Sequence, residues 1–184
     1  MYGLWNRLQY MLSPQFDIYE KVAGIVSGRV ADIGSGTGFG AHLFTRNCDM
    51  VVGVEVDAVA RKFAQRAFSN GKIQFFEGDI TSRKSPGHLD YYDYITMIDV
   101  IEHIEDTKIA LKNINEFLKP KGTFICSTPN RLSRYRKSEY HVREYSPEEL
   151  ESLLLCQFPY VKIVDYQLEP IKSEYENPII AICS

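Results

Sequence analysis

The sequence predicts an α/β protein with a mostly parallel, seven-stranded sheet that helices cover on both faces. Short apolar runs rich in Val, Ile, Phe and Tyr alternate with segments of helical periodicity, and Gly, Pro, Asn or Asp separates them. The length of 184 residues allows about 70% of the unfolded surface to be buried in one core. In sheets of this kind, ligands bind at the carboxyl ends of the strands. We therefore expect functional residues directly after strands.

The apolar and helical segments follow one another along the whole chain. Strands are expected at residues 29–33, 50–55, 73–77, 92–97, 123–127, 160–166 and 179–183. Helices are expected within 10–27 and at 40–47, 58–69, 107–118 and 147–155. The helix at 107–118 has an apolar stripe at spacings of three and four residues. The last helix begins with Ser146, Pro147 and Glu149, which are an N-cap, a proline at the first helical position and a capping-box glutamate.

The sequence shows no boundary between domains. No repeat, low-complexity tract or Pro/Gly/Ser-rich linker interrupts it, so residues 1–184 are expected to form a single domain. Residues 1–28 are expected to be an N-terminal helical segment, which either covers the ligand site as a lid or packs on the sheet. Residues 129–146 form one long irregular stretch, and loops of this length are usually functional or disordered.

Composition excludes several classes of protein. A net charge of −3 argues against binding to nucleic acid through bulk charge, and 45% apolar with 24% charged residues excludes disordered and fibrous chains. The four cysteines form no Cys-x-x-Cys pair, which favours free, buried thiols over a zinc site. The N-terminus lacks the pattern of a signal peptide and no run of eighteen apolar residues occurs, so we expect a cytoplasmic protein without a membrane span.

The strongest local signal is the segment 30–40, Val-Ala-Asp-Ile-Gly-Ser-Gly-Thr-Gly-Phe-Gly, which leads from a strand through a glycine-dense turn into a helix. Glycine allows positive φ and close approach of a ligand to the backbone. No Gly-Lys-Ser/Thr follows, so the turn is not a P-loop. Glu55 stands at the end of the next strand, where a ribose-binding acid is expected in a nucleotide site.

Asp32 separates two interpretations of this turn. An acid two residues before the first glycine would repel the pyrophosphate of a dinucleotide, which a helix N-terminus attracts. A cationic ligand explains this acid better. S-adenosylmethionine has a sulfonium, an α-ammonium and no phosphate, so Asp32 is expected to hold its amino end while the glycines admit the chain.

These segments resemble the class I S-adenosylmethionine-dependent methyltransferases. Asp32-Ile33-Gly34-Ser35-Gly36-Thr37-Gly38 is similar to their first motif, residues 51–55 to their second, residues 75–80 to the segment that meets the adenine, and residues 92–103 and 118–123 to the fourth strand and the turn into the fifth. The resemblance implies a Rossmann-like sheet whose last strand is antiparallel. It also implies S-adenosylmethionine as cofactor, with S-adenosylhomocysteine as product. The implied cofactor-binding residues are Asp32, Gly34, Ser35, Gly36, Gly38, Glu55, Val56, Asp79, Ile80 and Ile98.

Histidines are the expected bases, because a hydroxyl acceptor must lose its proton during methyl transfer. His103 and His141 follow the fourth and fifth strands, at the ligand-binding edge of the sheet, whereas His42 and His88 are expected to be structural or solvated. Glu102-His103 resembles the Glu-His pair of many small-molecule O-methyltransferases. Glu102, His103 and His141 are therefore the expected catalytic residues, and a local cap and ion pair is the alternative reading of the Glu-His pair.

The stretch 129–146 is expected to bind the acceptor. It resembles a family subgroup in which this loop closes over the acceptor site, and the expected contacts are Asn130, Arg131, Tyr140, Arg143 and Tyr145. Five basic side chains and one acid lie between Arg131 and Arg143, with tyrosines between them. Such a patch suits an anionic small molecule, a phosphate-linked lipid or a nucleic-acid strand. A merely solvated surface loop remains the alternative.

A metal site is a further alternative. Asp99, Glu102, His103 and His141 resemble the two carboxylates and two imidazoles that bind a divalent ion in methyltransferases acting on the 2′-hydroxyl of small-RNA 3′ ends, which usually have glutamate in place of Asp99. Oxygen and imidazole ligands suit Mg²⁺, Mn²⁺ or Fe²⁺. The more common subgroup without a metal shares most of these residues, so no metal is the first expectation.

Three functions follow from these patterns. The first is methylation of an oxygen on a small-molecule, lipid or glycan acceptor. The second is metal-dependent 2′-O-methylation of RNA. The third is a non-catalytic S-adenosylmethionine-binding module or partner subunit. The sequence does not identify the acceptor or the oligomeric state.

Overall fold

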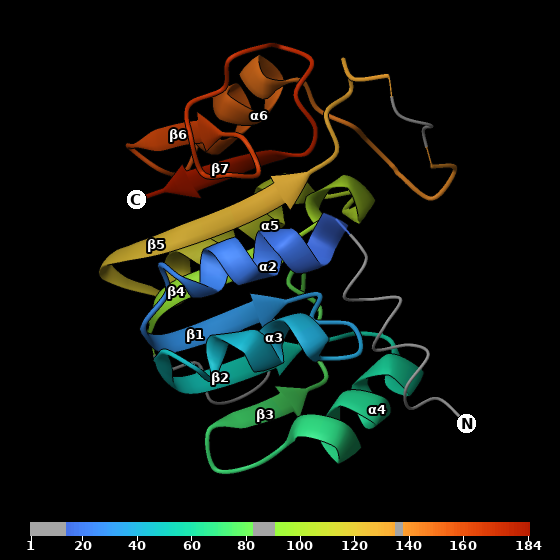
Figure 1. The fold of residues 1–184 in the computed structure, drawn as a ribbon, viewed down its shortest axis with the longest axis vertical. Helices are drawn as coiled ribbons and strands as arrows, with labels where there is room; N and C mark the ends of the chain where they lie inside the picture. The colour runs from blue at the N-terminus through green and yellow to red at the C-terminus, as the bar shows by residue number, and fades with distance from the viewer. Residues whose placement is uncertain (1–13, 83–90, 135–137) are drawn as a thin grey trace.

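The structure is a computed structural model that describes residues 14–82, 91–134 and 138–184. One seven-stranded sheet in the order β3-β2-β1-β4-β5-β7-β6 forms its centre (Figure 1). The strands are β1 Gly28–Ile33, β2 Cys48–Val54, β3 Ile73–Phe76, β4 Tyr92–Ile98, β5 Leu118–Thr128, β6 Val161–Val164 and β7 Ile179–Cys183. The predicted seven-stranded α/β fold is confirmed.

Strand direction decides where a ligand can bind. Strands β1 to β5 are parallel to one another, and β7 is antiparallel to both β5 and β6, as the resemblance implied. In Figure 1 the arrows of β1, β3 and β5 point to the right of the view, which is the common direction of the five parallel strands. Their carboxyl ends therefore meet at one edge, and the residues that follow these strands come together there.

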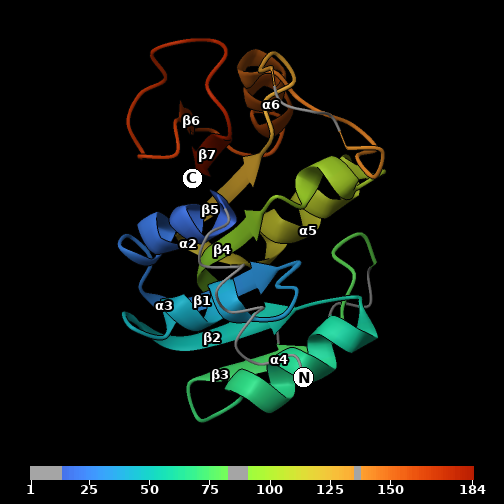
Figure 2. The same cartoon turned by 45° about the vertical axis from the view of Figure 1, so that its right-hand side comes forward.

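Helices cover both faces of the sheet (Figures 1 and 2). Helices α2 Pro14–Ala23, α3 Phe39–Phe44 and α4 Ala58–Phe68 bury their apolar sides in one core cluster, and α5 Thr107–Phe117 and α6 Pro147–Leu154 bury theirs in the other. Side chains of the parallel strands alternate between the two clusters, for example Val30 and Ala31 of β1. The interior strands are therefore apolar on both faces, which is why they read as continuous apolar runs.

The helix starts follow from local side-chain chemistry. Asp57 accepts a hydrogen bond from the backbone N–H of Ala60 at the start of α4, and Asp106 does the same for Ile109 in α5. The predicted capping box of α6 is present, with Ser146 and Glu149 each accepting from the other's backbone N–H. These caps begin α4 and α5 directly after segments that line the candidate site described below.

Some boundaries differ from the sequence prediction. Strand β5 begins at Leu118 rather than at residue 123, because Leu118 pairs with Tyr92 and the register shifts between Tyr92 and Tyr94. Lys121, at φ 70°, lies within this stretch. The prediction of buried thiols holds for three of the four free cysteines but is wrong for Cys156, which is exposed.

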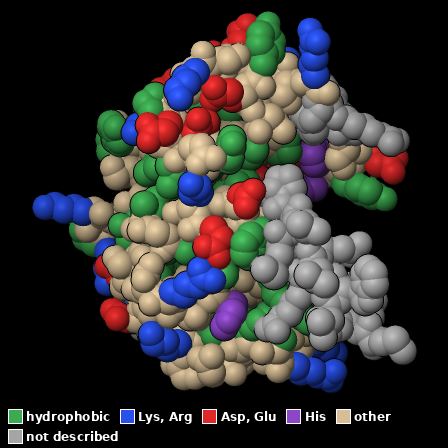
Figure 3. All heavy atoms as spheres, viewed as in Figure 1, with side chains coloured by type: hydrophobic (Ala, Val, Ile, Leu, Met, Phe, Trp, Pro, Cys, Tyr) green, Lys and Arg blue, Asp and Glu red, His purple; other side chains and the backbone are tan. Residues whose placement is uncertain are grey.

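The N-terminal segment is described from residue 14. Helix α2 packs against α3 and β4, so its described part covers one face of the sheet, and residues 1–13 of the expected lid lie outside the described residues. In the described chain, no helix combines the length and apolar character needed to cross a membrane. On the face drawn in Figure 3, acidic and basic side chains are interspersed, in keeping with the small net charge.

Candidate active site

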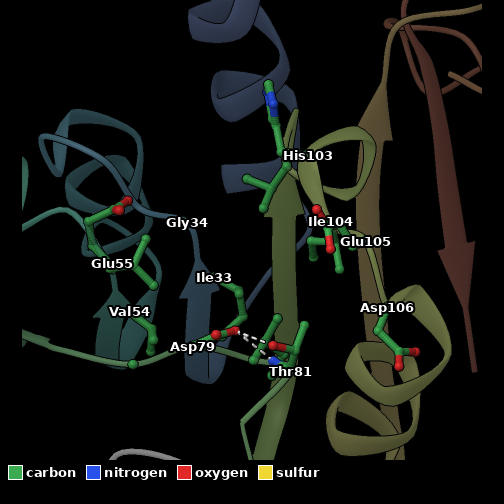
Figure 4. A pocket seen from close by; sticks show the side chains of 14 residues that line it. Ile33, Gly34, Val54, Glu55, Asp79, Thr81, His103, Ile104, Glu105 and Asp106 are labelled. Atoms are coloured by element: carbon green, nitrogen blue, oxygen red, sulfur yellow. Dashed lines mark hydrogen bonds between the residues drawn. The ribbon is translucent and has the colours of Figure 1, made fainter. Parts of the chain in front are cut away.

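A cleft of about 490 Å³ opens at the carboxyl ends of β1 to β4. Figure 4 shows Glu55 on one side of it, the segment from His103 to Asp106 on the other, and Asp79 with Thr81 below. Each wall comes from the residues directly after one strand, which are Ile33 and Gly34, then Val54, Glu55 and Val56, then Gly78, Asp79, Ile80 and Thr81, and finally Val100, His103, Ile104, Glu105 and Asp106. The expected cofactor residues Gly34, Glu55, Val56, Asp79 and Ile80 are thus brought together.

Glu55 connects the glycine turn to the end of β2. Its Oε2 accepts a hydrogen bond from the backbone N–H of Gly36 at 2.7 Å, and its Oε1 accepts from that of Asp57 at 2.8 Å. A carboxylate has about four acceptor positions, so each oxygen keeps a lone pair for a further donor. A ribose offers two neighbouring hydroxyl donors, and Glu55 fits that arrangement.

Gly34 and Gly36 suit their positions in the turn for different structural reasons. A Cβ on Gly34, which has φ 72°, would collide with the side chain of Val100, so β1 and the loop after β4 approach each other only because this residue is glycine. A Cβ on Gly36, which has φ 53°, would meet nothing within 4 Å. Backbone conformation and open space at Gly36 fit a turn that a ligand approaches closely.

Asp32 lies inside the fold and does not line the cleft. It is fully buried, and its carboxyl group accepts hydrogen bonds from the hydroxyls of Tyr19, at 3.1 Å, and Thr96, at 2.7 Å. Burial raises the pKa of Asp32 to about 7, although both hydroxyls act against the shift. Neither Asp32 nor Ile98 is among the residues that line the cleft, and both are buried within the fold.

The floor of the cleft follows β3. Asp79 accepts hydrogen bonds from the backbone N–H and the hydroxyl of Thr81 (Figure 4), and the carbonyl of Ile80 accepts one from the buried amide of Asn113 on α5. The backbone at Ile80 is therefore fixed by the opposite helix. Ser35 is buried beside Gly53, and Gly38 packs against Phe75 and Ala64, so these two belong to the frame of the turn.

The expected catalytic pair lies in a short 3₁₀ helix, η1 Ile101–His103, after β4. His103 Nδ1 lies 3.0 Å from the carbonyl oxygen of Tyr140. Because a carbonyl only accepts, Nδ1 carries the proton and Nε2 of a neutral ring has the lone pair. Glu102 is 1% exposed, and burial, together with the nearby charge of Asp99, raises its pKa to about 8.

His141 joins this pair from the loop after β5. The rings of His103 and His141 have centroids 5.0 Å apart and meet edge to face, and His141 Nδ1 lies 2.9 Å from Oε1 of Glu144. One ligand atom each of Glu102, His103 and His141 falls within 4.8 Å of the others, so this trio could hold a metal ion. Oε2 of Glu102 has no hydrogen-bond partner within the described chain, which is the environment that a cation would satisfy.

Asp99 lies at the edge of the same cluster. It has φ 53°, a conformation that aspartate tolerates better than most residues, and its Oδ1 accepts a 2.6 Å hydrogen bond from the hydroxyl of Ser127 on β5. Burial raises the pKa of Asp99, while Ser127 and both imidazoles act against that shift. Asp99 is not in the trio that could share an ion, so only three of the four alternative metal ligands come that close together.

The expected acceptor residues separate into two groups. Tyr140 and Arg143 are exposed beside the histidines, and the guanidinium of Arg143 lies 5.1 Å from the ring centroid of Tyr145, which is buried. Asn130 is fully buried, and its amide donates to the carbonyls of Glu174 and Glu176. Through these two contacts the amide of Asn130 joins the loop after β5 to the backbone of residues 174–176. Arg131 pairs with Glu149 at the start of α6.

Sequence reasoning missed several partners of the site residues. Tyr19 and Thr96 bind Asp32, Arg61 donates to the carbonyls of Glu55 and Val56, and Glu144 binds His141. The first two pairings join residues 13 and 64 positions apart, which no local pattern reveals. The spacing of three between His141 and Glu144 is the one local signal that could have been noticed. Outside the described residues lie Tyr135, Arg136 and Lys137 of the loop and His88. His42, in α3, stacks on Phe68 at the end of α4.

Comparison with known proteins identifies the family. A family model described as a methyltransferase domain matches residues 7–158. An uncharacterized methyltransferase of Mycobacterium bovis is 31% identical over 99 residues, which are 54% of this chain and 49% of that protein. The ubiquinone biosynthesis O-methyltransferase of Actinobacillus pleuropneumoniae is 29% identical over 119 residues, 62% of this chain and 51% of that protein. The chain spans about half the length of the curated relatives that it matches.

The solved structures extend the likeness to the fold. The methyltransferase domain of bacterial CtHen1-C superposes with a TM-score of 0.76 at 19% identity, covering 92% of this chain and 97% of that one. Most of the chain, and not the glycine turn alone, therefore has a counterpart of the same fold among known structures.

Proposed function

Since the chain belongs to the methyltransferase-domain family, we propose that it acts as a class I S-adenosylmethionine-dependent methyltransferase and methylates an oxygen of a small-molecule, lipid or glycan acceptor. The observation that carries this proposal is a pair of imidazoles, of which His103 lines the cleft and His141 contacts the ring of His103. A relative that is an O-methyltransferase of ubiquinone biosynthesis is consistent with an oxygen acceptor.

The cleft supports a specific arrangement of the cofactor. S-adenosylmethionine supplies an activated methyl group on its sulfonium when it is bound. Glu55 would accept hydrogen bonds from the two ribose hydroxyls, Gly34 and Gly36 would admit the amino acid chain, and Asp79 with Ile80 would bound the adenine. Because Asp32 is fully buried, outside the cleft lining, and binds Tyr19 and Thr96, its proposed part is to hold the turn in shape rather than to contact the ammonium directly.

The histidines would act as the base. His103 lines the cleft, and its Nδ1–H donates to the carbonyl of Tyr140, so the lone pair of Nε2 is available to take the proton of an acceptor hydroxyl. His141 would take this part if the acceptor enters from the loop side. Most of the acceleration would come from holding the acceptor oxygen in line with the methyl group. Tyr140 and Arg143 would contact an anionic or aromatic acceptor at the rim.

The test is a screen with tritiated S-adenosylmethionine over small-metabolite, lipid, protein and RNA fractions. We expect label in a metabolite or lipid fraction and its loss in the His103→Ala and His141→Ala variants. Label confined to protein or RNA would overturn the proposed acceptor class. Cofactor binding in calorimetry without transfer to any fraction would instead favour the third candidate, a binding module or partner subunit.

A second candidate function is metal-dependent 2′-O-methylation of RNA, which the trio of Glu102, His103 and His141 supports. The donors fit a divalent ion, because two imidazoles and a carboxylate with an unsatisfied oxygen converge. The ion would stabilise the acceptor oxygen as its proton leaves. A chelator would then abolish transfer and Mn²⁺ or Mg²⁺ would restore it, whereas an unchanged rate would exclude this candidate.

A further inference from the structure

Glu144 stands out because it is a buried acid among other acids. Its side chain is 7% exposed, and it adds to the charges that raise the pKa of the buried Glu102. Burying a carboxylate beside like charges costs stability unless a specific partner offsets that cost. One partner of this carboxylate is Nδ1 of His141, which lies 2.9 Å from Oε1 of Glu144 on a side chain that is 11% exposed.

The backbone around His141 is fixed on η1, but its ring is not fixed by that backbone. The N–H groups of Val142 and Arg143 both donate to the carbonyl of Glu102, at 2.9 and 3.1 Å. His103 is oriented by the carbonyl of Tyr140. For His141 the corresponding contact at Nδ1 comes from a side chain, the carboxylate of Glu144. The hydrogen bond to Nδ1 of this ring therefore comes from one replaceable side chain, beside the ring's packing on His103.

We propose that Glu144 is a positioning residue, which accepts the Nδ1–H of His141 and so keeps the lone pair of Nε2 turned toward His103 and Glu102. An ionised carboxylate only accepts, so this contact selects one of the two neutral tautomers of the ring. Both imidazoles then present an unprotonated Nε2, and base catalysis or metal binding needs an unprotonated ring nitrogen. The inference rests on the proposed function of His141. It adds Glu144, which acts through His141 and need not contact the acceptor or the cofactor.

The direct test is the tautomer of His141. Nitrogen–proton correlation spectra of the ¹⁵N-labelled full chain report which ring nitrogen bears hydrogen, and comparison with His141→Gln assigns the signal among the four histidines. We expect Nδ1–H in the wild type and loss of that preference in Glu144→Ala, with Glu144→Gln intermediate because an amide oxygen accepts more weakly. Glu139→Gln is the matched control, since Glu139 is an exposed acid of the same loop.

Activity gives the second readout. With the acceptor found in the screen, Glu144→Ala should lower kcat by about 10- to 100-fold, the usual effect of removing a group that orients a functional histidine, and leave cofactor affinity unchanged. An unaltered His141 tautomer in Glu144→Ala, or an equal effect in Glu139→Gln, would overturn the proposal. Glu144→Gln keeps the shape of the side chain if Glu144→Ala does not fold. Since the spectra need no acceptor, a chain without transferase activity would refute the proposed function and still leave this measurement decisive.

Discussion

The backbone N–H of Gly36 donates a 2.7 Å hydrogen bond to Oε2 of Glu55. This contact joins the turn after β1 to the end of β2, the two places where the family resemblance put the cofactor. It also means that the acid is held in position before any ligand arrives, since Asp57 N–H binds its other oxygen. A preoriented acceptor loses little entropy on binding.

Replacing Glu55 should therefore weaken cofactor binding strongly. Glu55→Gln is expected to lower the affinity for S-adenosylmethionine by about 10- to 100-fold, because hydrogen bonds to a charged group contribute about 1.5–3 kcal/mol. Titration calorimetry measures this change. Glu116→Gln serves as control, since Glu116 is an exposed acid on α5. Equal affinities of Glu55→Gln and the wild type would show that the ribose does not bind here.

Gly36 and Gly34 should respond differently to alanine. Gly36→Ala meets no neighbouring atom, so we expect a loss of about 1–2 kcal/mol in the free energy of unfolding from its positive φ alone, and a larger loss in cofactor affinity. Gly34→Ala should impair folding itself, because its Cβ collides with Val100. Urea unfolding and calorimetry on both variants measure the two effects. Full cofactor affinity in a folded Gly36→Ala protein would argue against a ligand at this turn.

The two histidines should affect catalysis and not cofactor binding. His103→Ala or His141→Ala is expected to lower kcat by about 10²- to 10⁴-fold, the usual contribution of a general base. Steady-state kinetics with the labelled acceptor and calorimetry with the cofactor separate the two quantities. A wild-type kcat in both single variants would show that neither histidine acts as the base.

Asp32 should make stability depend on pH. Its pKa is raised from 3.8 to about 7 in the folded chain, so between those values the folded state holds a proton that the unfolded state has released. Unfolding then releases a proton, and the free energy of unfolding falls as pH rises through this window, by on the order of 4 kcal/mol. Above about pH 7 this contribution becomes constant.

Asp32→Asn tests that dependence. Asparagine remains neutral and can still accept from Tyr19 and Thr96, so the variant should gain stability relative to the wild type as pH rises from about 4 to about 8. Urea unfolding across this range measures the difference. Glu102, whose pKa is also raised, adds a slope of the same sign that should persist in the variant. Parallel curves for the two proteins would contradict the assignment to Asp32.

The amino-acid sequence by itself determined the order of elements, the capped start of the last helix and the residues at the strand ends. These depend on local chemistry, such as the capping box at Ser146 or the glycine turn before α3, and parallel strands bring such ends to one edge automatically. That is why Gly34, Glu55 and Asp79, which the sequence predicted as cofactor residues, line one cleft in the structure.

Only the tertiary structure decided which polar groups partner one another. The partners of Asp32, which are Tyr19 from α2 and Thr96 from β4, were not predicted, and neither was the contact of Asn130 with the carbonyls of Glu174 and Glu176. The contact between Glu144 and His141 is visible only in the structure, where the loop after β5 packs against η1. The partners of a buried polar side chain are set by packing between distant segments, and no periodicity along the chain records that packing.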